Sequence, residues 1–413
     1  MINRKKLAAM GSGLALTLFL LGACGGSGLE SPFAVITLPD AGGVPYKLGE
    51  PLRGLSGTDQ VAFNNGFNSF LTKEDKADGL GPVFNGESCA QCHLKGAPGG
   101  AGNDLTLTRV TRIGGIRNGV YSDLVDLGGP VLQARSLKEF DSTYPIPGEV
   151  VPPGTQFVSH RITTPLFGAG LVEAIPDATI LARTKMSLPD GVAGVANMEL
   201  NPETNTLEVS RFGWKAQHSS LSVFAADAYL NEMGITSALF PNENLPQGHP
   251  ILPGLDVKAD PEDNDGDVAK FASFMRLLAP PSRAALSVNG KKGEALFSTV
   301  GCANCHVPSM KTGNNANPAL ANRDVDVYSD LLVHHMGSQL ADGIIQGKAT
   351  GDMFRTAPLW GLSKRVFFMH DGRATSYEAA IMAHGGEGEK AKQRFISLKL
   401  GDRSALDEFL GSL

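Results

Sequence analysis

The sequence predicts a mainly α protein of two related domains, the first of which carries β-strand insertions. Three observations lead to this prediction. The pentapeptide Cys-x-x-Cys-His occurs twice in the 413 residues, at positions 89–93 and 302–306, which indicates an internal repeat. Apolar residues at helical spacing precede each copy. Stretches in which apolar and polar residues alternate, as in half-buried strands, occur between the two copies.

Each pentapeptide has the spacing of a covalent haem attachment site. The two cysteines would form thioethers with the vinyl groups of a haem, and the adjacent histidine would be the proximal ligand of its iron. The residues concerned are Cys89, Cys92 and His93 in the first copy and Cys302, Cys305 and His306 in the second. The alternative is a redox-active cysteine pair or half of a zinc site, but neither explains a histidine after both pairs. We therefore expect two covalently bound haem c groups in two cytochrome c-like haem domains.

The fifth cysteine, Cys24, ends a segment that is typical of an export signal. Basic residues open it, an apolar run follows, and Leu21-Gly22-Ala23 precede the cysteine, within a length too short for a lasting membrane span. Small residues before a cysteine resemble the bacterial lipobox, which implies that residues 1–23 are removed and that Cys24 becomes a lipid anchor in the membrane. Haem is joined to such motifs after export, so a periplasmic location is expected. Gly25 favours the outer membrane by the bacterial sorting rule, and a plain cleaved signal is the alternative.

Composition and the positions of glycine and proline indicate how the remaining chain divides into domains. The 36 basic and 42 acidic side chains give a net charge of -6 without a basic block, so no nucleic-acid partner is expected. Residues 24–55 are rich in glycine and proline and are expected to form a tether. The Ala279-Pro280-Pro281 segment ends a helical pattern and marks a boundary. We expect an N-terminal haem domain over residues 56–285 and a C-terminal cytochrome c domain over residues 286–413.

Several helices and strands can be predicted by periodicity. Thr58 can cap a helix that carries Phe63, Phe67 and Phe70 on one face. Gly293 and Phe297 lie one helical turn apart before the second motif, in a helix that a C-terminal helix should cross closely. Further helices are expected over 220–233 and 269–278, and strands over 105–110, 156–160 and 206–209.

An acidic segment, Asp260-Pro261-Glu262-Asp263-Asn264-Asp265-Gly266-Asp267, precedes the helix expected at residue 269. Its oxygens could hold calcium. It departs from the calcium-binding EF-hand pattern, because its second position is proline and no glutamate closes the loop. A solvated acidic turn is the alternative interpretation.

A second repeat points to a known family. Thr163-Thr164-Pro165-Leu166-Phe167-Gly168 matches Thr356-Ala357-Pro358-Leu359-Trp360-Gly361, and each copy follows one Cys-x-x-Cys-His motif. Residues 55–413 resemble the dihaem oxidoreductase family, also labelled peroxidases or thiol oxidoreductases and related to bacterial dihaem cytochrome c peroxidases. The resemblance also rests on the segments 79–86, 169–176, 211–216 and 368–374. Thiol oxidation conflicts with the chemistry, because all four motif cysteines would be consumed in thioethers.

The resemblance also implies sixth ligands, which decide whether an iron passes electrons or binds peroxide. In the peroxidases the sixth ligand of the C-terminal haem lies fourteen residues after the histidine of a Phe-His-Asp-Gly segment. Counted from His370, that position is His384. The competing candidates are His334, His335 and Met336.

The first haem lacks such a ligand. The position that is histidine in the peroxidases is Arg109 here, and the next histidine along the chain is His160. The first iron is therefore expected to be five-coordinate or to carry water, with ligation by His160 as the alternative. Glu173, in the family segment 169–176, is the expected acid–base, unless it only bridges to Arg161 or caps the helix near Pro176. Trp214 is expected between the haems, as in related enzymes, or simply in the core. Trp360 is expected to pack on the second haem.

The expected function is that of a peroxidase-like oxidoreductase. Electrons from a small cytochrome c or a cupredoxin would enter at the C-terminal haem and cross to the N-terminal haem, where peroxide is reduced to water. Two alternatives stay open. One is a non-enzymatic electron-transfer cytochrome that serves a membrane or iron-uptake partner, and the other is an enzyme that uses peroxide to oxidise a partner protein.

Overall fold

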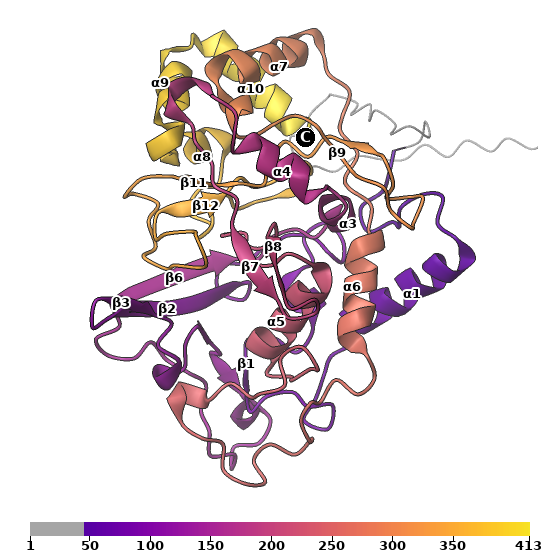
Figure 1. Ribbon diagram of the computed structural model, residues 1–413, viewed down its shortest axis with the longest axis vertical. Helices are drawn as coiled ribbons and strands as arrows, with labels where there is room; N and C mark the ends of the chain where they lie inside the picture. The colour runs from indigo at the N-terminus through magenta and orange to yellow at the C-terminus, as the bar shows by residue number, and fades with distance from the viewer. Residues whose placement is uncertain (1–44) are drawn as a thin grey trace, which may run out of the picture. The chain divides into compact units, whose positions relative to one another are not determined.

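The computed structural model describes residues 45–413, shown in colour in Figure 1. The export signal, Cys24 and most of the tether lie outside the described residues, so the expectations about them stay predictions. In the described range, no helix is both long enough and apolar enough to cross a membrane.

Helices and short antiparallel strands alternate along the described residues (Figure 1). The helices are α1 (Gly57–Leu71), α2 (Cys89–Cys92), α3 (Ala169–Glu173), α4 (Asp177–Arg183), α5 (Leu221–Met233), α6 (Asp267–Leu277), α7 (Val288–Val300), α8 (Tyr377–Ala383), α9 (Glu389–Ser397) and α10 (Leu400–Gly411). The strands are β1 (Val83–Phe84), β2 (Arg109–Arg117), β3 (Val120–Ser122), β4 (Val131–Leu132), β5 (Arg135–Ser136), β6 (Phe157–Ile162), β7 (Met198–Asn201), β8 (Thr206–Val209), β9 (Met310–Lys311), β10 (Asp324–Val325), β11 (Val333–His335) and β12 (Met353–Arg355). With 32% helix and 15% strand, the mainly α prediction is only partly correct.

Helix α1 packs on α6 and on the first motif, which forms α2. Phe63 and Phe70 of α1 lie 5.4 and 4.8 Å from the ring of Phe274 on α6. At Gly66 a Cβ atom would lie 2.2 Å from the carbonyl oxygen of Lys270, so only glycine permits this approach. The cap of α1 is Ser56 rather than the predicted Thr58, because Ser56 and the residue at the third helical position form a reciprocal capping box.

Helices α7 and α10 repeat this construction around the second motif. A Cβ atom at Gly293 would lie 1.9 Å from the carbonyl oxygen of Ala405, which confirms the predicted close crossing. Phe297, four residues later, lies 6.5 Å from the ring of His306 at an interplanar angle of 58°. In the first half, Phe70 lies four residues after its crossing glycine and 6.1 Å from the ring of His93, at 59°. The two motifs are therefore supported in the same way.

The strand insertions lie between α2 and α5. Strand β2 pairs with β3, β4 and β6, and β7 forms a hairpin with β8. The strands predicted over 156–160 and 206–209 are confirmed with small shifts. The strand predicted over 105–110 is wrong for most of its length. The side chain of Asp104 accepts hydrogen bonds from the backbone of Thr106 and Leu107, at 2.7 and 3.1 Å, and holds this stretch in a turn.

Two main hydrophobic cores hold the described residues together. One surrounds α1, α5 and α6, and the other surrounds α7 and α10. Residues from the segment that follows the second motif, among them Met310, Leu320, Val327 and Leu332, belong to the first core. The two halves therefore share interior, and the described residues belong to one compact unit.

Candidate functional site

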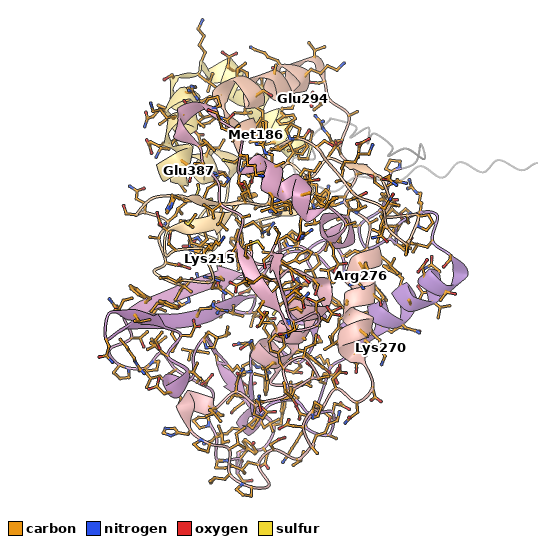
Figure 2. All side chains as sticks on the ribbon, in the orientation of Figure 1. Met186, Lys215, Lys270, Arg276, Glu294 and Glu387 are labelled. Atoms are coloured by element: carbon orange, nitrogen blue, oxygen red, sulfur yellow. The ribbon has the colours of Figure 1, made fainter. Side chains whose placement is uncertain are left out.

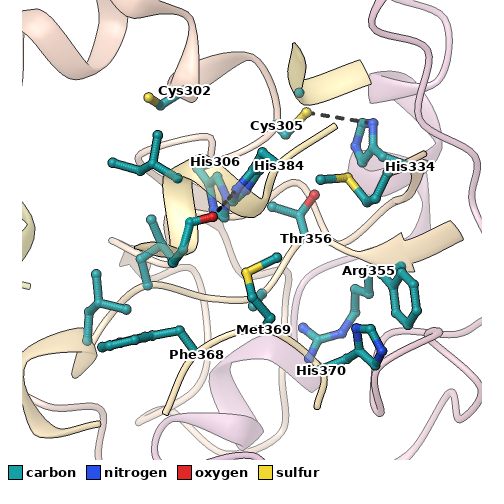
Figure 3. A pocket seen from close by; sticks show the side chains of 18 of the residues that line it. Cys302, Cys305, His306, His334, Arg355, Thr356, Phe368, Met369, His370 and His384 are labelled. Atoms are coloured by element: carbon teal, nitrogen blue, oxygen red, sulfur yellow. Dashed lines mark hydrogen bonds between the residues drawn. The ribbon is translucent and has the colours of Figure 1, made fainter. Parts of the chain in front are cut away.

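A pocket beside the second motif is lined by residues from both halves of the chain. Cys302, Cys305 and His306 lie on its wall together with His384, and the first half contributes Thr164 and Trp214. The space between its lining atoms is about 1640 Å³, including open solvent at its mouth. The wall is mostly apolar side chains (Figure 3), as expected for the site of a large flat cofactor.

The rings of His306 and His384 lie close together in this pocket, with their planes tilted by 59° (Figure 3). Their centroids are 6.5 Å apart. Two metal–nitrogen bonds of about 2.0–2.1 Å, each extended by ~1.1 Å to the ring centre, give about 6.3 Å. In both rings Nδ1 is engaged with a backbone carbonyl, that of Tyr328 at 3.0 Å for His306 and that of Ala380 at 2.8 Å for His384. Each Nε2 is thereby left for a metal, and the pair fits an iron between the rings.

The competing ligands are engaged elsewhere. His334 hydrogen-bonds through Nδ1 to Glu387 at 2.8 Å and through Nε2 to Asp330 at 3.0 Å. Burial disfavours its charged form, but these hydrogen bonds outweigh burial and raise the pKa of His334 to about 12. A protonated ring has no lone pair for iron. His335 is half-exposed and hydrogen-bonds to Asp352. Met336 lines the pocket, but the spacing of the His306 and His384 rings favours His384.

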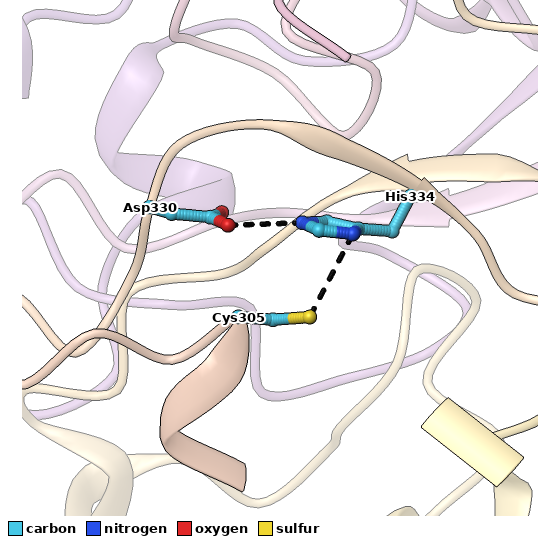
Figure 4. Close-up of side chains that lie close together, drawn as sticks. All are labelled: Cys305, Asp330 and His334. Atoms are coloured by element: carbon cyan, nitrogen blue, oxygen red, sulfur yellow. Dashed lines mark hydrogen bonds and ion pairs between the residues drawn. The ribbon is translucent and has the colours of Figure 1, made fainter. Parts of the chain in front are cut away.

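Cys305, Asp330 and His334 lie close enough to suggest a metal site of a different kind (Figure 4). One atom from each lies within 4.8 Å of the others. A structural zinc site takes four ligands, and Cys302, the other cysteine of the second motif, is not in the group. The protonated state of His334 also opposes metal binding.

The four motif thiols are unpaired and unsuited to redox exchange. All four are free cysteines. Burial raises the pKa of Cys92 and Cys302 to about 12 and that of Cys89 and Cys305 in the same direction. Reactive cysteines need a lowered pKa, because the thiolate is the nucleophile. The chemistry of the thiols therefore opposes a thiol oxidoreductase.

Two arginines on the wall of the pocket beside the second motif lack an acidic partner. Arg355 donates Nε to the carbonyl oxygen of Gly213 at 2.8 Å, and Arg365 donates Nη2 to that of Pro358 at 2.6 Å. Within residues 45–413 neither forms an ion pair with a carboxylate. Burial lowers the pKa of both to about 10. Such a site favours an anionic ligand, and the carboxylates of a haem meet that requirement.

A second pocket lies beside the first motif, between α2, α5 and α6. Its wall includes Cys89, Cys92 and His93, with Tyr229 from α5 and Phe271 from α6. The Nδ1 atom of His93 is buried without a hydrogen bond of good geometry, although the backbone of Gly100 and Thr164 is close to the ring. Burial lowers the pKa of His93 to about 4, so the ring is neutral and can bind a metal.

Among residues 45–413, no histidine other than His93 lines this first-motif pocket. Arg109 lies on its wall. His160 is exposed on β6, and its Nδ1 atom is 3.1 Å from the hydroxyl oxygen of Thr111. Met233 and Met275 also line the pocket, which sequence reasoning missed. Helical periodicity along α5 and α6 was the available signal for them.

Glu173 does not line either haem-motif pocket. One of its oxygens lies 2.6 Å from Nε of Arg276 on α6 (Figure 2), and the other accepts a hydrogen bond from the backbone of Leu221 at 2.8 Å. The alternative interpretation named other partners: Arg161 pairs with Asp342 instead, and Glu173 bridges to Arg276 and caps α5. Its acid–base role stays a prediction that these contacts do not support.

A different carboxylate, that of Glu232 on α5, lies on the wall of the first-motif pocket. Burial, with a contribution from Asp227, raises the pKa of Glu232 to about 7. Ala225, Ala228 and Glu232 follow one another at helical spacing on the face that lines the pocket. Sequence reasoning missed Glu232 because it ends a helix that is otherwise apolar on this face.

A small cavity shares lining residues with both pockets, and parts of both Thr-x-Pro-Leu repeats line it. Trp214 lines this cavity and the second-motif pocket, and its indole donates a hydrogen bond to the carbonyl oxygen of Ile162 at 2.8 Å. Leu166 and Phe224 line the cavity and the first-motif pocket. Trp360 lies in the cavity and packs on Gly168 rather than lining the second-motif pocket, contrary to expectation. Gly168 has no side chain, so the ring fits against its backbone.

A buried ionic cluster positions the residues around Trp214. Asp342 accepts a hydrogen bond from Nη2 of Arg161 at 2.9 Å and lies 3.1 Å from Nζ of Lys215. Lys215, labelled in Figure 2, also donates to the carbonyl oxygen of Met353 at 2.9 Å. These contacts link β6, the segment that carries Trp214, and β12, which ends at Arg355.

The sequence matches one family model. The family described as "Di-haem oxidoreductase, putative peroxidase" matches residues 155–413, which contain the second motif, both Thr-x-Pro-Leu repeats and His384. The first motif precedes the matched range. No curated protein matches the chain.

Solved structures offer distant similarity in fold. Hydrazine synthase from Kuenenia stuttgartiensis is 14% identical and aligns over 98% of this chain and 100% of its own, with a TM-score of 0.39. The diheme peroxidase BthA from Burkholderia thailandensis E264 is 13% identical over 92% and 89%, with a TM-score of 0.41. A MauG-like protein associated with microbial copper homeostasis is 14% identical over 90% and 94%, with a TM-score of 0.40.

Proposed function

Because this chain belongs to the di-haem oxidoreductase family, we propose that it is a periplasmic dihaem c-type cytochrome that reduces peroxide at its first haem with electrons from its second. Membership of the family implies two haem groups. Their covalent attachment through the four motif cysteines is the part of the proposal that rests on this chain's own residues.

The difference between the two pockets carries the proposal. His306 and His384 lie close together in one pocket, whereas His93 is, among the described residues, the only histidine on the wall of the other. When bound, a haem iron with two strong ligands passes electrons, and one with an open position binds and reduces peroxide. This difference supports electron entry at the second-motif pocket and peroxide reduction at the first.

Glu232 is the side chain best placed to accept and donate protons in the first-motif pocket. Reduction of peroxide takes up two electrons and two protons and releases two waters. At a pKa of about 7, the carboxyl of Glu232 can hold a proton or release one near neutral pH. It would accept the proton of one peroxide oxygen and return it to the oxygen that leaves as water.

The small cavity that shares lining residues with both pockets supports an electron path through protein. Trp214 extends from the second-motif pocket into that cavity, and Phe224 extends from the cavity into the first-motif pocket. The ring of Trp214 is held by the hydrogen bond to Ile162. The donor in this proposal is a small cytochrome c or a cupredoxin, and the lipid on Cys24 would keep the protein at the outer membrane.

A second candidate function is favoured by Met233 and Met275. Either thioether could become a sixth ligand in the first-motif pocket, as methionine does in electron-transfer cytochromes. Both irons would then have two strong ligands, and the protein would be an electron-transfer cytochrome rather than a peroxidase.

Low-temperature electron paramagnetic resonance of the purified dihaem protein tests the two functions. Peroxidase function predicts one high-spin and one low-spin ferric signal, with the high-spin signal changed by peroxide. Two low-spin signals that do not respond to peroxide would establish the electron-transfer alternative.

Two matched variants then test the proton path. Glu232→Gln should retain both haems and lower the rate of reaction with peroxide in stopped flow by about 10²–10⁴-fold. Glu173→Gln should react at nearly the wild-type rate, because Glu173 lines neither pocket. The reverse result would restore the role predicted for Glu173 from the sequence.

A further inference from the structure

Four carboxylates gather in the loop between α5 and α6, outside both haem-motif pockets. They belong to Glu243, Asp256, Asp260 and Glu262, and one oxygen of each lies within 4.8 Å of the others. All four come from a stretch of twenty residues that returns on itself between the two helices. Proximity of acidic groups alone is common on protein surfaces, so the state of each side chain decides what the cluster can do.

Glu262 is fully buried, with one oxygen left unpartnered. Its exposed fraction is 0%. Its Oε2 atom accepts a hydrogen bond from the backbone of Thr236 at 2.9 Å, whereas Oε1 has no hydrogen-bond partner. Oε1 of Glu243 is likewise buried without a partner. A buried carboxylate oxygen without a partner is costly, which points to a positive group that the side chains of the loop do not supply.

The protein itself does not neutralise the cluster. Lys258 lies in the same loop but donates its ammonium group to the carbonyl oxygen of Asp78 at 2.8 Å. Four carboxylates held this close together repel one another unless a cation or protons balance their charge.

We propose that Glu243, Asp256, Asp260 and Glu262 bind one calcium ion. The donors are all oxygen, which selects a hard cation and opposes zinc or copper. Oxygens on opposite sides of calcium are about 4.6–5.2 Å apart, twice the usual bond, and the four carboxylates place one oxygen each within 4.8 Å of the others, close enough to share one ion. Magnesium keeps several of its waters and is seldom held by a cage of protein carboxylates, so calcium fits this ligand set better.

The ligand set differs from the acidic turn that the sequence suggested. Of that turn, Asp260 and Glu262 belong to the cluster, and Glu243 and Asp256 come from earlier in the loop. Asp263 instead caps α6, where its side chain accepts a hydrogen bond from the backbone of Asp267 at 2.6 Å. The site therefore joins distant parts of the loop rather than a single turn.

The site ties together segments that wall the first-motif pocket. Thr236, which holds Glu262, follows directly after α5, and Glu262 precedes α6. A Cβ atom at Gly79 would lie 2.7 Å from Oε1 of Glu262, so the chain that leads to the first motif also lies against the cluster. Two residues later, the backbone of Gly81 donates a hydrogen bond to the carbonyl oxygen of Met233 on α5. A calcium ion would hold these segments in one arrangement.

The test uses the full dihaem protein after treatment with a chelator and dialysis. Isothermal titration with calcium chloride should give one ion per chain, and the thermal unfolding midpoint, followed by circular dichroism, should rise with calcium concentration. Magnesium chloride at the same concentrations should give a smaller rise. Absence of calcium binding, or equal responses to both ions, would overturn the proposal.

Variants locate the site. Glu243→Gln and Glu262→Gln should weaken calcium binding by more than about tenfold. Asp265→Asn, which removes a charge from an exposed residue of the same loop outside the cluster, should bind calcium like the wild type. If Glu262→Gln fails to fold, Glu243→Gln decides the question. Wild-type affinity in Glu243→Gln would refute the site.

Discussion

Replacement of Asp342 by asparagine should destabilise the protein by about 3–5 kcal/mol, the cost of leaving buried charges without their partner. The exposed fractions of the Arg161, Lys215 and Asp342 side chains are 5%, 0% and 3%. Asp342 also accepts a hydrogen bond from the hydroxyl of Ser159 at 2.7 Å. Asparagine keeps the shape of the side chain but leaves two buried cations without a counter-charge. At ~2 °C per kcal/mol for a chain of this size, the unfolding midpoint should fall by about 6–10 °C.

The pH dependence of this cost has a definite sign. Burial, opposed by Asp342, lowers the pKa of Lys215 to about 8. A base whose pKa is lower in the folded protein releases protons on folding, so its contribution to stability improves as pH rises from about 8 towards 10.5. Without Asp342 this pKa falls further. The cost of Asp342→Asn should therefore be smaller at pH 9 than at pH 7.

The assay is thermal unfolding followed by circular dichroism at both pH values. Asp126→Asn is the matched control, because Asp126 pairs with Arg117 at an exposed site where a salt bridge contributes about 0–1 kcal/mol. An Asp342→Asn midpoint as high as that of Asp126→Asn, or a cost that grows with pH, would refute the reasoning.

Three further predictions concern the haem sites and their supports. His384→Ala should convert the second haem from low-spin to high-spin in its absorption spectrum and leave the first haem unchanged. His335 is half-exposed, so His335→Ala should change neither haem. A low-spin second haem in His384→Ala would point to Met336 as the ligand. Cys305→Ala should contain one correctly attached haem by pyridine haemochrome and mass spectrometry, and two equivalents would contradict covalent attachment at both motifs. Gly293→Ala should lower the unfolding midpoint, because its Cβ atom would meet the Ala405 carbonyl oxygen at 1.9 Å. The control Gly401→Ala, whose Cβ atom has nothing within 4 Å, should stabilise the protein by about 0.5–1 kcal/mol. Similar midpoints for the two variants would show that the crossing tolerates a side chain.

The attachment motifs and the long amphipathic helices could be predicted because their signals are local. Two cysteines and a histidine at fixed spacing need no tertiary context, and neither does the apolar stripe of α10. The strand predicted over 105–110 failed for a reason that is also local. An aspartate side chain that bonds the following backbone competes with a strand, and alternation of apolar residues does not reveal that competition.

The pocket walls could not be predicted, because they are assembled from distant elements. Glu232 and Met275 reach the first-motif pocket only through the packing of α5 and α6 around α2. His384 was predicted from its spacing to His370 in related enzymes, which stands in for tertiary information. The residues around Glu173 match the family segment, but the direction in which its side chain points depends on where α6 places Arg276.

The segment between the second motif and β11 has a consequence for the rate of electron transfer. Its apolar side chains, such as Leu320 and Leu332, are embedded in the core that surrounds the first motif. Packed interiors resist deformation, so the haem halves cannot rotate against each other as two bodies on a hinge would. We expect the exchange of electrons between the two sites to be set by a fixed tunnelling distance through protein. That rate should be insensitive to solvent viscosity, whereas docking of the donor should slow as viscosity rises.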